Sequence, residues 1–173
     1  MKKTKKMALS AILAALSVVI LLLGSVITVL DLTSVALASI LIMIAVIELR
    51  GGYPYLIWLV AGTLSILIVP DKFGALLYLI FGGVYPIFKA MFERLHYVVA
   101  WILKFSCFNL MMIIAVIFAN YILHIPDTGL GFTLPLFAIC NFTFLLYDIA
   151  ATQLITLYLI KFRKILGLGN FFK

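Results

Sequence analysis

Ionisable residues inside long apolar runs are the first candidates for chemistry. Asp148 lies midway along the last run, and Lys104 lies about two turns inside the run before it. Measured from the predicted cytoplasmic helix ends, the 1.5 Å rise per residue places Lys104 about 11 Å deep and Asp148 about 18 Å deep. Placing a charged group at membrane depth costs free energy, so such a residue suggests a functional site in which another group pairs with it. We expect a Lys104–Asp148 pair; alternatively, Lys104 reaches the membrane surface and Asp148 bonds to neighbouring hydroxyl groups.

Uncharged polar residues form two stripes in the same runs. Asn141, Asp148 and Thr152 share one helix face, and Asn109 and Asn120, eleven residues apart, share another. If the stripes face each other, they line a polar cleft between the last two helices. An apolar, aromatic-lined cavity with a few polar groups is typical of a small-molecule site. The predicted ligand residues are Tyr78, Tyr85, Asn109, Asn120, Asn141 and Asp148, framed by Phe81, Tyr121 and Phe137. Interhelical hydrogen bonding without a ligand is the open alternative.

Catalytic and metal-binding patterns are absent from the sequence. It contains no zinc-protease motif, no nucleophile elbow and no phosphate-binding glycine loop. Cys107 and Cys140 lie inside apolar runs without the paired spacing of a metal site, and His96 and His124 are too far apart to share an ion. We therefore expect no enzyme activity, no metal and no cofactor.

The composition is that of a membrane protein. Of the 173 residues, 66% are hydrophobic and 11% are charged, whereas soluble domains carry about 25% charged residues. The net charge of +7 comes from short basic clusters between apolar runs. This distribution favours an anionic membrane surface as the partner, and not nucleic acid.

Six apolar runs are long enough to cross a bilayer, which takes about 17–25 residues. Backbone groups in lipid must be satisfied within each segment, so the runs predict helices. The expected fold is an all-α integral membrane bundle in a single domain, 1–173. Its predicted helices cover about 7–30, 33–49, 53–69, 73–90, 97–123 and 133–160, and Arg50-Gly51-Gly52 is expected to end the second.

The basic residues predict the orientation of these helices. If six helices alternate, eleven Lys and Arg fall on one side and Lys72 alone falls on the other. The positive-inside rule then places both termini in the cytoplasm. Glu48, near this side, is expected to pair with Arg50 or to reach the interface.

The first helix carries a stripe of small residues. Ala8, Ala11 and Ala15 share one face near the cytoplasmic end. Small residues let membrane helices approach closely, either within one bundle or between subunits. With Lys2–Lys6 before it, the small-residue stretch Ala11-Ile12-Leu13-Ala14-Ala15 resembles the S components of energy-coupling factor (ECF) vitamin transporters, as do the chain's size and six helices.

The resemblance implies a function and a set of partners. It implies a substrate-binding subunit for a vitamin or other small organic solute in the bacterial plasma membrane. In that family, the small-residue stretch docks on a transmembrane coupling subunit that is joined to two ATPases, which makes Ala11 and Ala15 the expected contact residues. The alternative is a structural or interaction protein of the cell envelope, similar in size and helix number to the rod-shape protein MreD.

Overall fold

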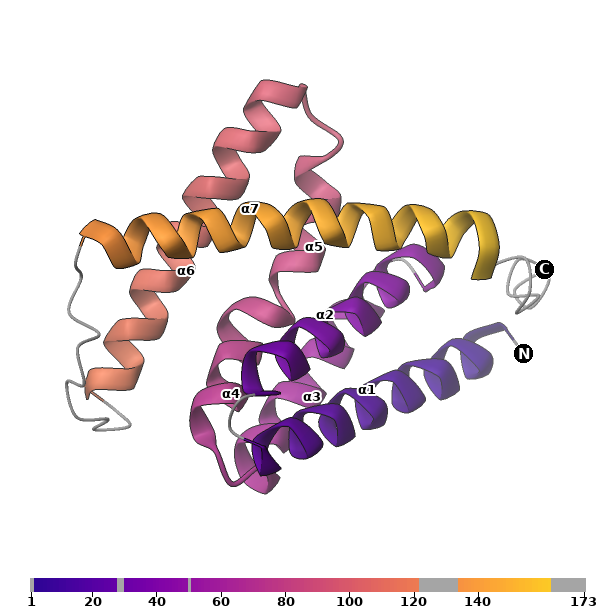
Figure 1. Cartoon of the computed structure of the whole chain (residues 1–173). Helices are drawn as coiled ribbons and strands as arrows, with labels where there is room; N and C mark the ends of the chain where they lie inside the picture. The colour runs from indigo at the N-terminus through magenta and orange to yellow at the C-terminus, as the bar shows by residue number, and fades with distance from the viewer. Residues whose placement is uncertain (1, 28–29, 50, 122–133, 163–173) are drawn as a thin grey trace. The chain divides into compact units, whose positions relative to one another are not determined.

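The computed structural model describes residues 2–27, 30–49, 51–121 and 134–162, and within them the chain is helical without strands. Three segments, α4, η2 and α5, follow one another as a single interrupted helix, so the described chain forms six helices. The predicted all-helical class is confirmed (Figure 1). The elements are α1 (Lys2–Val26), α2 (Asp31–Glu48), α3 (Tyr53–Ile68), α4 (Lys72–Leu77), η2 (Tyr78–Gly82), α5 (Tyr85–Phe92), α6 (Tyr97–Tyr121), α7 (Leu134–Leu157) and η3 (Tyr158–Phe162).

Five helices are long and apolar enough to cross a membrane. They cover Lys3–Val26, Asp31–Glu48, Lys72–Phe92, Tyr97–Phe118 and Phe137–Lys161. The predicted third span corresponds to α3, whose 16 residues extend about 24 Å, less than the roughly 30 Å of a hydrocarbon core. Large apolar side chains cover the outer surface; Ile12 is 62% exposed and Leu67 is 76% exposed. Such a surface suits lipid better than water.

The chain separates into two compact units. The first, Lys3–His124, holds α1 to α6, and the second, Ile125–Lys173, holds α7 and η3. The predicted Lys104–Asp148 pair would join the two units, so it stays a prediction. The single domain expected over residues 1–173 also stays a prediction.

Several helix ends differ from those expected. The first helix begins at Lys2 and ends at Val26, whereas 7–30 was expected, because lysine is a good helix former even where it cannot enter lipid. The glycine stop of the second helix is confirmed: Gly51 has φ = +70°, a left-handed conformation that glycine adopts without strain. The fourth predicted helix starts at Lys72, where the Asp71 carboxylate accepts hydrogen bonds from the amides of Phe73 (3.2 Å) and Gly74 (3.3 Å).

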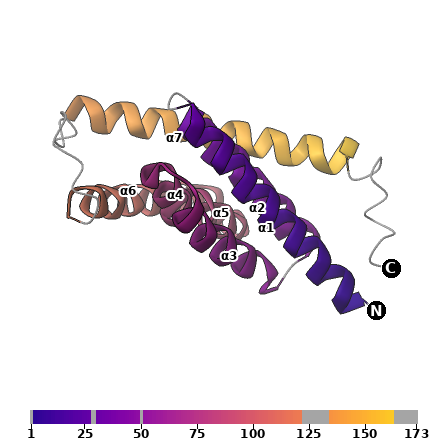
Figure 2. The ribbon, with the colours of Figure 1, turned by 90° about the horizontal axis from the view of Figure 1, so that it is seen from below.

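Contacts at both ends hold α1 and α2 together as an antiparallel pair. Near one end, Lys6 Nζ donates to the carbonyl oxygen of Leu49 (3.3 Å) and lies 5.8 Å from the centre of the Tyr53 ring. Near the other, the backbone of Gly24 lies directly against the Ser34 side chain. A side chain at Gly24 would occupy the space of Ser34, so this glycine permits the close approach. The two helices lie side by side in Figures 1 and 2.

The π-helical turn η2 interrupts the fourth predicted helix. The amide of Gly83 bonds to the carbonyl of Tyr78, five residues back, at 2.8 Å. Pro86 has no amide hydrogen, and its ring would clash with the carbonyl of Gly82, so a regular helix cannot continue through this point. Gly82 permits a close approach to α2, because a Cβ atom on Gly82 would lie 2.6 Å from Val35 Cγ1.

Trp58 on α3 completes the hydrogen bonding of this turn. Because the Gly83 amide bonds to Tyr78, the carbonyl of Leu79 loses its regular α-helical donor. The indole Nε1 of Trp58 donates to that carbonyl at 2.9 Å. The Trp58 ring lies against Gly83, where a Cβ atom would overlap it. The interruption and the packing of α3 therefore depend on each other.

We expect Gly83→Ala to destabilise the protein by about 1–3 kcal/mol, because the added methyl group displaces the Trp58 indole. Thermal unfolding in detergent, followed by circular dichroism, measures the change. Gly52→Ala is the matched control, since Gly52 has φ = −84° and open space around the position of a Cβ atom. Equal stability of the two variants would contradict the role given to Gly83.

Candidate functional site

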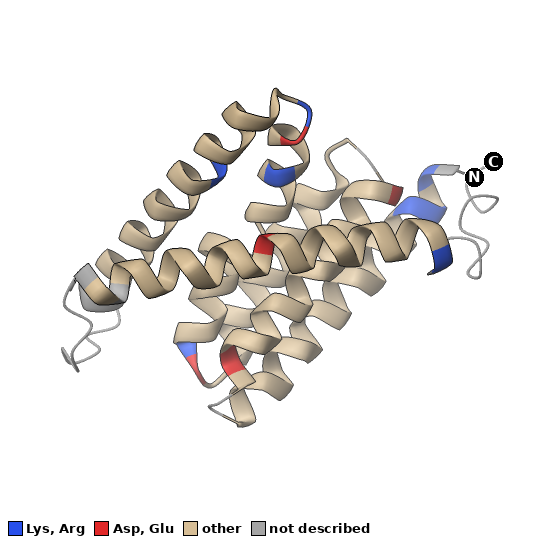
Figure 3. Cartoon of the chain, turned by 45° about the horizontal axis from the view of Figure 1, so that its top comes forward, with Lys and Arg blue, Asp and Glu red and all other residues tan. Residues whose placement is uncertain are grey.

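Two lysines and one glutamate form a cluster at the turn between α5 and α6, here called the Glu93 cluster. Lys89 lies on α5 and Lys104 on α6, and they are 1% and 5% exposed. Glu93 follows the last residue of α5, one turn after Lys89, so the two side chains share a face. The antiparallel return of α6 brings Lys104 to the same carboxylate. Most charged residues of the first unit lie at or near helix ends (Figure 3). Lys104, the eighth residue of α6, lies about two turns inside its helix.

One carboxylate oxygen of the cluster accepts from both cations. Glu93 Oε1 is 2.9 Å from Lys89 Nζ and 3.0 Å from Lys104 Nζ. Lys104 Nζ also lies 5.1 Å from the centre of the Trp101 ring, a cation–π contact. A buried ammonium group requires such partners, because its transfer out of water is otherwise strongly unfavourable. Glu93 itself is 38% exposed, so solvent screens one side of the cluster.

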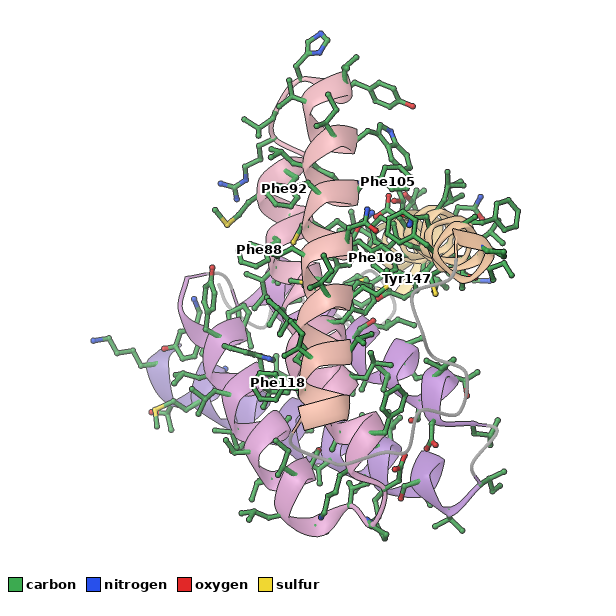
Figure 4. All side chains as sticks on the ribbon, turned by 90° about the vertical axis from the view of Figure 1, so that its left-hand side faces the viewer. Phe88, Phe92, Phe105, Phe108, Phe118 and Tyr147 are labelled. Carbon is green, nitrogen blue, oxygen red and sulfur yellow. The ribbon has the colours of Figure 1, made fainter. Side chains whose placement is uncertain are left out.

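Aromatic side chains extend from the Glu93 cluster along α5 and α6. Phe88 stacks on Phe92 with ring centres 6.0 Å apart, and Trp101 lies 5.8 Å from Phe105. In Figure 4, Phe88 and Phe92 lie to one side of α6, whereas Phe105 and Phe108 point to the other. Of these rings, Trp101 contacts the cluster directly, through the ammonium group of Lys104.

The predicted ligand residues of the first unit lie in or near its core. Tyr78 and Tyr85 are both 0% exposed, one at the start of η2 and the other at the start of α5. The Phe81 ring stacks on Tyr85 at 5.2 Å and meets Phe108 edge-on at 5.6 Å. Asn109 is half-buried on α6, and its Nδ2 donates to the carbonyl of Phe105 at 2.9 Å. A solute could reach Tyr78 or Tyr85 only after the helices around them separate.

The other predicted ligand residues cannot be placed in the same site. Asn141 and Asp148 lie on α7, in the second unit. There Asn141 Nδ2 donates to the carbonyl of Phe137 at 2.9 Å, and Thr152 donates to that of Asp148 at 2.8 Å. Asn120 lies on α6 but its side chain, like that of Tyr121, is outside the described residues. The cleft expected between the last two helices stays a prediction.

Two buried hydroxyl groups make no hydrogen bond with the described residues. They are Ser65 Oγ on α3 and Tyr78 OH on η2. The Ser17 hydroxyl of α1 donates to the carbonyl of Leu13 at 2.9 Å, and none of the described residues forms a hydrogen bond with the Tyr78 hydroxyl. Buried polar groups without partners are rare and cost about 1–3 kcal/mol each.

Sequence reasoning missed the central residue of this region, Glu93. Its spacing of four from Lys89 was visible in the sequence, but its contact with Lys104 depends on the length of the turn between α5 and α6. Glu48 is buried at the end of α2, and Arg50, its expected partner, lies outside the described residues. Among the described residues no group of three or more metal-binding side chains occurs.

Comparisons of the chain with protein-family models, with curated proteins and with solved structures give no match.

We expect Glu93→Gln to destabilise the protein by about 1–3 kcal/mol, since it leaves two buried ammonium groups without their shared carboxylate. Lys104→Met should cost less, because the Glu93–Lys89 pair survives and methionine fills the same space. Unfolding in detergent at fixed ionic strength measures both. Arg94→Gln, on the exposed neighbour of Glu93, is the control and should lie within about 0.5 kcal/mol of the wild type. A Glu93→Gln protein as stable as this control would contradict the role of Glu93.

Proposed function

We propose that the chain is a membrane-embedded binding subunit for a small organic solute, of the ECF S-component type. In this proposal, a transmembrane coupling subunit and separate ATPases supply the energy for import. The sequence carries no phosphate-binding glycine loop of its own, which fits a subunit that depends on another protein for ATP hydrolysis. We place the protein in a bacterial plasma membrane with both termini in the cytoplasm, on the basis of its one-sided distribution of basic residues.

The observation that carries the proposal is the direction in which the alanine stripe of α1 points. Ala8, Ala11 and Ala15 are exposed, whereas Ala14 and Ser17, on the other side of the helix, are buried. Packing within the first unit therefore uses a different face of α1 from the one that carries the stripe. An exposed row of small residues on an apolar helix allows a second membrane helix to approach closely.

In the first unit, the proposed solute site lies among Tyr78, Tyr85 and Asn109. Both tyrosines are fully buried, so binding requires a rearrangement near the interrupted helix. The π-helical turn that ends at Gly82, the Gly83 after it and Pro86 give this segment fewer regular backbone hydrogen bonds than a continuous helix. This irregularity supports a helix that changes shape when solute enters.

We expect Ala11→Trp and Ala15→Trp to abolish capture of a membrane partner, because an indole prevents close helix approach at the stripe. The measurement is affinity purification of the tagged protein from its native membrane in mild detergent, with bound proteins identified by mass spectrometry. Ile12→Trp is the matched control, since Ile12 is 62% exposed, adjacent in sequence and already large. Capture of the same membrane subunit and ATPases by all three variants would contradict docking at the stripe.

We expect the purified wild-type protein to retain a small molecule that mass spectrometry detects after denaturation. Asn109→Ala should lower its affinity about three- to tenfold, the effect of one lost hydrogen bond. Thr63→Ala is the control, because Thr63 also bonds to its own helix backbone (2.8 Å to the carbonyl of Leu59) but lies on exposed α3 surface. If the protein captures a membrane partner but retains no small molecule, the result would overturn solute binding and favour the cell-envelope alternative.

A further inference from the structure

In the membrane-spanning arrangement proposed above, the turn between α5 and α6 lies at a surface of the bilayer. One apolar span ends with α5 and the next begins with α6, so residues 93–96 stand between two spans. Arg94 and His96 in this turn are exposed. Tyr97, the first residue of α6, is 73% exposed, and its ring meets that of Trp101 edge-on at 6.4 Å. Tyrosine and tryptophan at the ends of spans are typical of the membrane–water interface.

The Glu93 cluster holds one carboxylate oxygen between two buried cations at this level. Lys89 Nζ and Lys104 Nζ lie 2.9 Å and 3.0 Å from the same atom, Glu93 Oε1. The two ammonium groups come from different helices, and each has three donors and no acceptor. The structure thus forms a position for an oxyanion between α5 and α6, and Glu93 occupies it.

The occupant of this position differs from the two lysines in its access to solvent. Both lysines are buried, whereas the Glu93 side chain is 38% exposed and follows the last residue of α5. A rotation of this side chain brings its carboxylate into water, where hydration offsets much of the lost ion pairing. The position between the two ammonium groups is then open to an oxyanion from outside the chain.

The surface next to the cluster indicates which oxyanion this is. At the surface of a bilayer, the phosphodiester groups of lipids are the abundant oxyanions, and basic pockets between membrane helices bind them. The exposed Arg94 adds a cation beside Glu93. Val98 and Ile102, one helical turn apart at the start of α6, are 56% and 64% exposed. Such a surface suits acyl chains, which a small soluble anion does not have.

We propose that the Glu93 cluster is a binding site for the phosphodiester group of an anionic phospholipid. A phosphate oxygen takes the place of Glu93 Oε1 between Lys89 and Lys104, and the Glu93 carboxylate turns to water. The acyl chains lie along the exposed apolar start of α6. The site goes beyond the proposed solute-binding function and shares no residue with the solute site or with the alanine stripe.

Titration of the full-length protein in detergent with dioleoyl-phosphatidylglycerol, followed by native mass spectrometry, tests this site. One lipid should bind at least about tenfold more tightly than zwitterionic dioleoyl-phosphatidylcholine. Lys104→Met should lower the affinity for phosphatidylglycerol about tenfold or more, the effect of one lost hydrogen bond between charged groups. Lys3→Gln is the matched control, because it removes an exposed cation outside the cluster; its affinity should stay within about twofold of the wild type.

Glu93→Gln distinguishes a binding site from a purely structural ion cluster. Because this substitution removes the competing carboxylate, it should raise the affinity for phosphatidylglycerol, and the added lipid should restore most of the stability that the variant loses. A Glu93→Gln protein that phosphatidylglycerol stabilises no more than it stabilises the wild type would overturn the proposal. So would equal affinities of Lys104→Met and Lys3→Gln for this lipid.

Inorganic phosphate, added at the same concentrations, separates a lipid headgroup from a free anion. It should compete weakly with phosphatidylglycerol, since it lacks acyl chains. Binding of inorganic phosphate as tight as that of the lipid would overturn the assignment to a phospholipid. Solute retention and partner capture, measured on the same variants, test the proposed function separately.

Discussion

The carbonyl oxygen of Leu79 lies inside a helix that is long and apolar enough to cross a membrane, and it has no donor from its own helix. In hydrocarbon no water replaces a missing donor, so another part of the protein must supply one. The Trp58 indole does so from α3. This bond needs Gly83 beside the ring and close contact of Gly62 with Leu79, where a Cβ atom would lie 2.9 Å from Leu79 Cδ1. Because the Leu79 carbonyl needs a donor from outside its helix, α3 packs against the interrupted helix at this point.

The two ends of the interrupted helix carry different charged groups. It begins near Gly74, where the carboxyl groups of Asp31 and Asp71 both lie close to the backbone, and ends in the Glu93 cluster with its two lysines. In the proposed orientation, the lysines lie at the cytoplasmic end and the two aspartates at the outer end, and the apolar stretch between them crosses the lipid. At the Glu93 end one carboxylate links α5 to α6, and at the other end the Asp71 carboxylate caps the start of α4.

Hydrophobicity predicted the helices well because lipid exposure requires long apolar runs. The helix expected over 53–69 and the observed α3 (Tyr53–Ile68) agree almost completely. The glycine stop after α2 lies at Gly51, as predicted. The π-helical turn was not predictable, because it depends on Trp58, some 20 residues away in sequence, as well as on the local Gly82-Gly83 and Pro86. Glu93 was missed for a similar reason: its second cation, Lys104, comes from the returning helix. The ligand residues of α6 and α7 remain predictions, since polar spacing along one helix does not determine which helix faces it.

The positions of the two tryptophans make the protein its own optical probe. Trp58 donates its indole hydrogen to a backbone carbonyl beside the π-helical turn, whereas Trp101 lies against a lysine ammonium group at the far end of the interrupted helix. Since the chain contains two tryptophans in all, replacing either one by phenylalanine leaves a single fluorophore at a known place. The emission of Trp58 alone then reports on the interior of the interrupted helix, and that of Trp101 alone reports on the turn between α5 and α6, without any attached dye.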